Sequence, residues 1–494
     1  MSRIGFDNDK YIELQSERIR RRIAEFGGKL YLEFGGKLFD DYHASRVLPG
    51  FAPDSKMRML RSFGSQVEII IVINANDIEK NKRRGDLGIS YDDDVLRLTD
   101  AFHGAGLYVG SVVITQYAGQ PGADRFRRKL SSLGIRCYRH YPIAGYPSDV
   151  KNIVCEDGYG RNDYIETTRP LVVVTAPGPG SGKMATCLSQ LYHDYHRGIA
   201  SGYAKFETFP IWNLPLKHPV NLAYEAATAD LNDVNMIDPY HLEAYGQTTV
   251  NYNRDVEIFP VLNATFEMIQ GNSPYKSPTD MGVNMAGFCI VDDEACCEAS
   301  KLEILRRYYD AQVALKKGGG DTDVVRKLEL IMKQAGITSE INPAIGAALL
   351  KEKLTGAPAA AMTLPDGRVI TGKTSSLLGA SAALMLNALK ALAGIDKEVD
   401  LISPTVIEPI TKLKTQNLGH HNPRLHSDEM LVALCVSAVS DPNAALAQKQ
   451  LEKLRGLNAH FSVIPSAVDE KIYKRLGVNV SCEPVYEVSK LYHK

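Results

Sequence analysis

The chain has 494 residues, a formal net charge of −1 and a hydrophobic share of 44%. Such a length suits two to four domains, and a charged share of 23% is ordinary for a globular protein. A net charge near zero supplies no overall basic field of the kind that attracts nucleic acid or a membrane surface. No run reaches the roughly 18 apolar residues that a transmembrane helix needs. We therefore expect a small-molecule substrate, and neither nucleic acid nor a membrane, as the partner.

The cysteines and the N-terminus indicate a compartment. The eight cysteines are scattered and none forms a C-x-x-C pair, so no zinc site or disulfide framework is indicated. The first eight residues lack the apolar core of a signal peptide. These features predict a reduced, cytoplasmic protein.

The first part of the chain alternates between helices and strands. We predict helices over 11–25, 94–105 and 124–133, and strands over 30–34, 67–73, 108–115, 135–140 and 171–174. This alternation predicts an α/β domain over residues 1–288, built on a doubly wound, mostly parallel sheet. Such sheets bind ligands outside the carboxyl ends of their strands. Asn76 and Asp77 follow the strand at 67–73, where they either contact a ligand or form an Asx turn that caps the next helix.

A glycine-rich loop follows the strand at 171–174 and leads into a helix. Strand, glycine loop and helix is the arrangement in which backbone N–H groups and a helix N-terminus hold a phosphate. We expect the phosphate to be bound by Gly178, Gly180, Ser181, Gly182 and Lys183. The Lys183 ammonium would neutralise charge on the transferred phosphoryl group.

Two positions of this loop depart from the phosphate-loop pattern G-x-x-x-x-G-K-[ST]. Pro177 occupies the first glycine position, and Met184 replaces the hydroxyl residue that would ligate magnesium. Methionine supplies no hard oxygen ligand. The alternative is that the loop is only a tight turn between a strand and a helix.

Residues 367–374 match the same pattern letter for letter. Residues 368–371, however, are rich in β-branched side chains, which favour a strand over a phosphate-binding loop. Asp366 and Gly367 before them indicate a turn. We predict a hairpin strand that leads into a helix, and the alternative is a small anion bound at the N-terminus of that helix.

Further candidates lie between the glycine loop and residue 235. Lys205 lies on the predicted strand after the loop helix, where phosphate-loop kinases often place a substrate-facing lysine, and we assign it a catalytic role by that analogy. Asp230 and Asp233 lie in an Asx-rich segment and are candidate magnesium ligands, with Asp230 also a candidate catalytic residue. The alternative for this segment is a set of turns.

The second part of the chain is predicted to contain a helical segment and a further domain. Residues 289–355 are predicted to be a helical segment, and residues 356–494 a second, smaller α/β domain. His421, Arg424 and His426 lie in a loop of that domain, and we expect them to bind substrate. A metal site and a plain polar surface loop are the alternatives. Because polar clusters come from both α/β domains, we expect a functional cleft between them, unless the second domain serves only as an oligomer interface.

The whole chain resembles uncharacterised protein family 0371, also called domain of unknown function 1846. Three segments carry the resemblance: 31–50, the glycine loop through Tyr192, and 209–238. The resemblance implies a bacterial cytoplasmic protein and implies no activity. Residues 171–192 alone are similar to phosphate-loop enzymes of the dethiobiotin-synthetase type.

These observations lead to three hypotheses about function. The first is an ATP-dependent kinase or carboxylate-activating ligase that uses magnesium and acts on a small metabolite. The second is an enzyme that binds a phosphorylated metabolite or dinucleotide without hydrolysing ATP. The third is a non-catalytic, nucleotide-sensing scaffold. In each case we expect a homo-oligomer.

Overall fold

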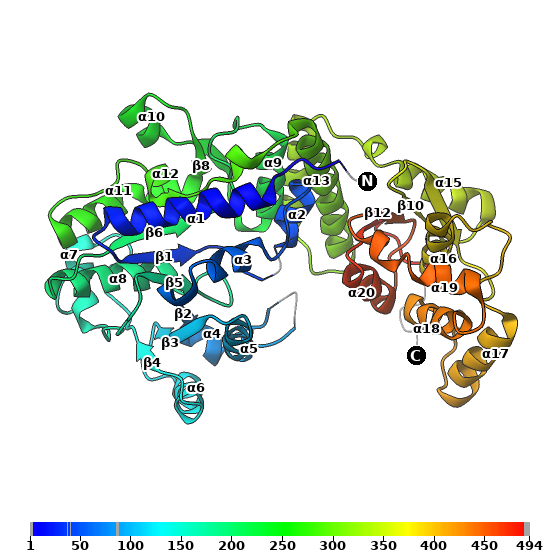
Figure 1. Cartoon of the computed structure of the whole chain (residues 1–494), viewed down its shortest axis with the longest axis horizontal. Helices are drawn as coiled ribbons and strands as arrows, with labels where there is room; N and C mark the ends of the chain where they lie inside the picture. Colours follow the sequence, from blue (N-terminus) through cyan, green and yellow to red (C-terminus); the bar gives the residue numbers. More distant parts are fainter. Residues whose placement is uncertain (1–2, 37, 40, 85–87, 489–494) are drawn as a thin grey trace. The chain divides into compact units, whose positions relative to one another are not determined.

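The computed structural model describes residues 3–36, 38–39, 41–84 and 88–488 (Figure 1). The chain divides into two compact units. The N-terminal unit contains Ile4–Glu225 and Asp233–Cys296, and the C-terminal unit contains Met1–Arg3, Ala226–Asn232 and Cys297–Lys494. No helix in the described part of the chain is long and apolar enough to cross a membrane.

The N-terminal unit is built on a seven-stranded sheet with the order β4-β3-β2-β5-β1-β6-β9. Every neighbouring pair in it is parallel. Its strands are β1 (Leu30–Phe34), β2 (Val67–Asn74), β3 (Tyr108–Thr115), β4 (Cys137–Arg139), β5 (Leu171–Thr175), β6 (Gly202–Phe206) and β9 (Gly282–Val283). The predicted parallel, doubly wound α/β sheet is therefore confirmed.

Helices separate the strands of this sheet. The longer ones are α1 (Asn8–Glu25), α3 (Ser55–Arg61), α5 (Tyr91–Gly104), α6 (Pro121–Ser132), α8 (Lys183–His196), α9 (Pro219–Ala227), α10 (Pro239–Tyr245) and α11 (Asn253–Gln270). The shorter ones are α2 (Tyr42–Val47), α4 (Ala75–Glu79), α7 (Val150–Ile153) and α12 (Pro278–Met281), and a small antiparallel pair joins β7 (Asn235–Ile237) to β8 (Val250–Tyr252).

The central strands are mostly apolar and are buried along nearly their whole length, because both faces of the sheet are covered. Every residue of β1 and β5 is buried. Alternate residues such as Tyr31, Val172 and Val174 pack in one cluster with Leu188 of α8 and Phe266 of α11. Continuous burial is what a parallel sheet with helices on both faces requires.

The topology marks one place at the edge of this sheet. The chain moves outward from β2 to β3 and β4 in one direction, and from β5 across β1 to β6 in the other. Because β2 and β5 are neighbours, the connections that follow them leave in opposite directions. A crevice outside the carboxyl ends of these strands is the usual ligand site of such a sheet.

The C-terminal unit contains a four-stranded mixed sheet with the order β11-β10-β12-β13. Its strands are β10 (Ala359–Thr363), β11 (Val369–Lys373), β12 (Asn458–Phe461) and β13 (Asn479–Cys482). Its helices are most of α13 (Asp293–Lys316), together with α14 (Thr322–Gln334), α15 (Pro343–Thr355), α16 (Ala380–Ala393), α17 (Pro404–Lys412), α18 (Ser427–Ser437), α19 (Pro442–Gln448) and α20 (Ala467–Arg475). The second, smaller α/β unit is confirmed, and the predicted helical residues from Cys297 onward belong to that same compact unit.

The sequence that matches the phosphate-loop pattern at 367–374 forms a hairpin strand, as predicted. β11 pairs antiparallel with β10. Both glycines of the pattern have other roles: Gly367 has φ +84° in the turn, and a Cβ on Gly372 would lie 2.2 Å from the backbone nitrogen of Leu384. Gly372 thus allows α16 to pack closely on the strand.

Residues 444–454 do not form one continuous helix. α19 ends at Gln448, and a separate 3₁₀ turn covers Leu451–Leu454.

Candidate functional site

A pocket of about 410 Å³ lies in the N-terminal unit at the carboxyl ends of β2, β3 and β4 and beside the glycine loop that follows β5. Its lining combines loop backbone, neutral polar side chains and aromatic rings: Asn74, Asn76, Thr115, Gln116, His140, Tyr141, Ile143, Tyr146, Gly180, Gly182 and Ala185. The pocket therefore occupies the place that the strand order indicates.

The glycine loop is held in position by two hydroxyl groups. The Thr115 hydroxyl donates to the Ser181 carbonyl at 2.7 Å, and the Ser181 hydroxyl donates to the Gly178 carbonyl at 2.7 Å. Gly180 and Gly182 have φ of +75° and +90°, a conformation that other residues rarely adopt. Gly178 is needed for a different reason, because a Cβ there would lie 2.3 Å from the Tyr91 hydroxyl.

The backbone N–H groups of this loop lack acceptors. Within the described residues, no hydrogen bond is donated by the N–H groups of residues 180–185, which cover the end of the loop and the first turn of α8. Gly180, Gly182 and Ala185 line the pocket. Free N–H groups and the positive end of a 14-residue helix together favour an anion at this position.

At the end of β2, where the sequence left a ligand contact and an Asx turn open, the structure contains the turn. The Asn74 side chain accepts from the Asn76 N–H as the cap of α4, and it also donates to the Gly180 carbonyl at 3.3 Å. Both asparagines line the pocket, whereas Asp77 does not and forms an ion pair with Lys82 at 3.4 Å.

His140 is a polar group of the pocket that the sequence analysis did not select. The side chain is buried, and Nε2 lies 3.3 Å from the Asp163 carbonyl oxygen. Burial lowers the pKa of His140 to about 4. The imidazole is therefore neutral at pH 7 and offers the pocket a hydrogen-bonding group without charge.

The lowered pKa of His140 predicts a loss of stability in mild acid. The contribution of neutral His140 to the free energy of unfolding is fully present above pH 6.5, the ordinary pKa of histidine. It is lost as the pH falls towards 4, because over this range only the unfolded chain takes up the proton. We expect His140→Gln to reduce the drop in unfolding free energy between pH 7 and 4.5 by about 2–3 kcal/mol. Urea denaturation at the two pH values measures this, with the exposed His421→Gln as the control. Equal drops in the wild type and in His140→Gln would contradict the assignment.

One side of the pocket is apolar and aromatic. Ile143, Tyr141 and Tyr146 line it, and the guanidinium carbon of Arg161 lies 4.8 Å from the Tyr141 ring centroid. Such a wall suits the organic part of a ligand whose anionic part lies on the loop.

The two lysines that we predicted to be catalytic occupy different surroundings. Lys183 is the first residue of α8 and is partly buried beside the pocket-lining Gly182. Lys205 does not line the pocket and forms ion pairs with Glu207, at 2.9 Å, and with Asp255. Lys183 is not among the lining residues either, but it directly follows Gly182, which is.

Asp230 and Asp233 are not brought together as a metal site. Asp230 is exposed in the short turn Ala229–Leu231, whereas Asp233 is buried and accepts from Arg254 at 2.8 Å. Neither aspartate belongs to a group of three or more potential metal ligands among the described residues, and neither lines the pocket.

The three predicted substrate residues of the second half belong to the C-terminal unit. Arg424 and His426 line a separate small pocket there, whereas His421 is exposed and does not. His426 Nδ1 lies 3.0 Å from a carboxylate oxygen of Asp469.

Several pocket residues that the sequence analysis missed either end a predicted strand or follow one directly. Thr115 ends β3, Gln116 follows it, and His140 and Tyr141 follow β4. The rule that placed Asn76 at the end of β2 applies equally to these strands, and it would have selected them. Tyr146 lies further along the loop, and no sequence signal indicates it.

Comparisons with known proteins identify the family. Residues 4–336 match the N-terminal domain of unknown function DUF1846, and residues 340–492 match its C-terminal domain. A UPF0371 protein of Streptococcus pyogenes serotype M5 (strain Manfredo) is 58% identical over 494 residues and covers 100% of both chains. A UPF0371 protein of Streptococcus equi subsp. zooepidemicus (strain H70) is 59% identical over 492 residues, covering 100% of this chain and 98% of its own.

Among solved structures, the ORC2 protein of Aeropyrum pernix in its ADP form aligns with 94% of this chain and 92% of its own. The identity is 9% and the TM-score is 0.17, which is too low to support an argument about fold or function. The evidence for identity is therefore the two domain matches and the full-length similarity to the streptococcal proteins, and it shows that this chain belongs to the bacterial DUF1846 (UPF0371) family.

Proposed function

We propose that the N-terminal unit binds a small phosphate-bearing metabolite, with the phosphate on the glycine loop and the organic part against the aromatic wall. The observation that carries this proposal is the set of N–H groups of residues 180–185, which have no acceptor among the described residues and lie at the pocket. Anions bind such groups through several short hydrogen bonds at once.

The same pocket favours a ligand that arrives without magnesium. Magnesium takes carboxylate and other hard oxygen ligands, and no aspartate or glutamate is among the lining residues of this pocket. Met184 supplies no hydroxyl at the position where phosphate-loop enzymes ligate the ion. We therefore favour an enzyme that binds a phosphorylated metabolite or dinucleotide over an ATP-dependent kinase or ligase.

We also propose that the protein works in the cytoplasm. The support is that all eight cysteines are free thiols, as expected in a reducing compartment.

Replacing Lys183 by alanine tests the phosphate site. We expect binding of a phosphorylated ligand to weaken by roughly 1–3 kcal/mol, the range for a charged hydrogen bond, with little change in folding stability. Calorimetric titration with ATP, ADP and sugar phosphates, with and without magnesium, measures this and ranks the ligands. Affinities that do not depend on magnesium would support the favoured hypothesis.

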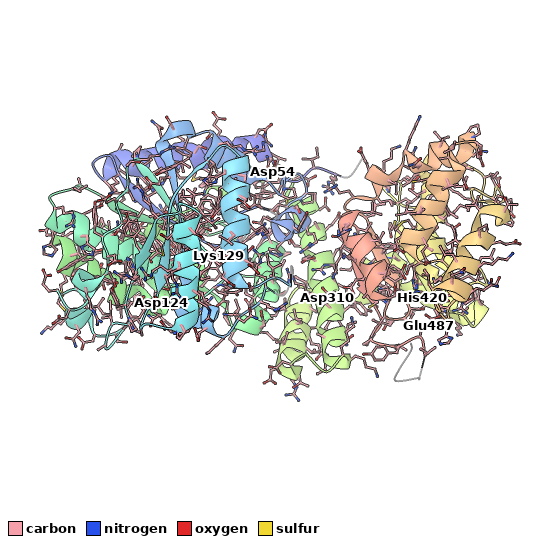
Figure 2. All side chains as sticks on the ribbon, turned by 90° about the horizontal axis from the view of Figure 1, so that it is seen from below. Asp54, Asp124, Lys129, Asp310, His420 and Glu487 are labelled. Atoms are coloured by element: carbon pink, nitrogen blue, oxygen red, sulfur yellow. The ribbon has the colours of Figure 1, made fainter. Side chains whose placement is uncertain are left out.

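A matched control is Lys129→Ala, which removes an exposed lysine of α6 (Figure 2). This variant should bind like the wild type. If Lys183→Ala binds every ligand as tightly as Lys129→Ala does, the glycine loop is not the phosphate site.

A further inference from the structure

A second, smaller pocket in the C-terminal unit has features that the proposed function does not use. Its volume is about 60 Å³, enough for one small ion or a few water molecules. It lies at the N-terminus of the 14-residue α16, where Gly379, Ala380 and Ser381 line it.

Hydrogen-bond donors without acceptors gather at this helix end. The Ala380 N–H donates to the Thr374 hydroxyl, but within the described residues the N–H groups of Ser381 and Ala382 donate no hydrogen bond. The Ser381 residue is only 6% exposed and lines the pocket. No hydrogen bond joins its hydroxyl to any residue that the structure describes, so the hydroxyl is free to bind a ligand in the pocket.

Two basic residues also line this pocket. Arg424 contributes a guanidinium with five N–H donors, of which one contacts Glu487 at 3.3 Å. His426 lies on Asp469, and this hydrogen bond raises the pKa of His426. The imidazole is thus held by its Nδ1 in one orientation at the pocket.

Two carboxylates also line the pocket, but one of them is fully engaged. Asp469 accepts from His426, from the Ser466 hydroxyl, and from both the N–H and the hydroxyl of Ser427. The negative charge of Asp469 is therefore stabilised by these donors. Glu487, labelled in Figure 2, forms an ion pair with Arg424 and remains 43% exposed.

We propose that this pocket is an oxyanion site that binds a phosphate-sized group through Ser381, Arg424, His426 and the N-terminus of α16. The group is either inorganic phosphate or the terminal phosphoryl group of a small molecule, since both present the same oxygens. The site is separate from the glycine loop and does not depend on the proposed function.

The test is equilibrium dialysis of the full chain with radiolabelled inorganic phosphate, in a Lys183→Ala background that weakens the first site. We expect one bound phosphate in this background, and an affinity at least fivefold lower after Ser381→Ala and at least tenfold lower after His426→Gln. Ser381→Ala removes a hydroxyl that has no protein partner, so we expect this variant to fold like the wild type. The test therefore remains valid even if His426→Gln unfolds the C-terminal unit. His421→Gln is the matched control on the same loop and should bind normally.

Removing the negative charge of Glu487 tests whether the ligand of this pocket is an anion. Glu487→Gln should tighten phosphate binding, because it removes a like charge from the pocket.

Displacement of the label by glycerol phosphate would identify a phosphoryl group on a larger molecule as the ligand, and displacement by inorganic phosphate alone would identify the free ion. If Lys183→Ala binds no phosphate, or if Ser381→Ala and His426→Gln bind it as the His421→Gln control does, this second site does not exist. A Lys183→Ala variant that keeps its affinity for organic phosphates would instead contradict only the glycine-loop proposal.

Discussion

Gly182→Ala is expected to lower the affinity of the glycine loop for a phosphorylated ligand at least tenfold. Gly182 has φ +90°, where an alanine costs about 1–2 kcal/mol. Its Cβ would also lie 3.1 Å from the Thr115 methyl carbon and 3.2 Å from the Thr115 hydroxyl oxygen. That hydroxyl holds the Ser181 carbonyl, so the loop must shift and its N–H groups lose their common direction.

Gly180→Ala is the matched control for this prediction. Gly180 has φ +75°, but a Cβ there would meet nothing within 4 Å. The two variants share the backbone cost, and only Gly182→Ala displaces Thr115. Calorimetric titration with the best ligand of the wild type, together with thermal unfolding of both variants, separates the two effects. If both variants bind equally well, contact with Thr115 does not position the loop.

The fold could be predicted from the sequence where burial leaves a simple pattern. β2 and β5 are covered on both faces, and residues 69–73 and 171–174 within them are continuous runs of apolar, mostly β-branched residues. α11 was missed as a distinct helix because it contains Pro260, which signals a break although the helix continues through it. β12 and β13 have four residues each; β12 pairs with β10 and with β13, and β13 pairs with β12.

The candidate site could be predicted only where one short segment forms it. The glycine loop carries its own signal, because positive φ and close approach require glycine at particular positions. His140 reaches the pocket because β4 pairs with β3. This pairing joins two segments of the chain, so neither segment alone predicts it. Asp230 and Asp233 show the opposite case: neighbours in sequence, they differ in burial, and the partner of Asp233 is Arg254, 21 residues further along.

Lys205 is the other position where substitution should have a large effect, and its surroundings indicate a structural role. Its side chain is 16% exposed and lies between the carboxylates of Glu207 and Asp255. Burial alone would lower the pKa of Lys205, but these two carboxylates raise it. Burial in turn raises the pKa of Glu207 to about 7, against the attraction of Lys205.

This cluster makes the stability of the wild type depend on pH. Because the folded pKa of Glu207 is above its ordinary value of 4.5, its contribution is fully present below pH 4.5 and is lost as the pH rises through 7. Glu207→Gln should remove this dependence in urea denaturation between pH 5 and 8. If the unfolding free energy of Glu207→Gln falls with pH as steeply as that of the wild type, the assignment is contradicted.

Lys205→Met should destabilise the protein by about 3 kcal/mol at pH 8, because it leaves two largely buried carboxylates without their ammonium partner. The loss should be smaller at pH 5, where Glu207 can take up a proton and only one charge stays unpaired. The double variant Lys205→Met/Asp255→Asn removes one of the two charges and should recover part of the stability at pH 8. A catalytic lysine would behave differently, since Lys205→Met would then abolish turnover while the unfolding free energy stayed near that of the wild type. Measuring both quantities on the same preparation therefore decides between the ion cluster and the catalytic role that we predicted from the sequence.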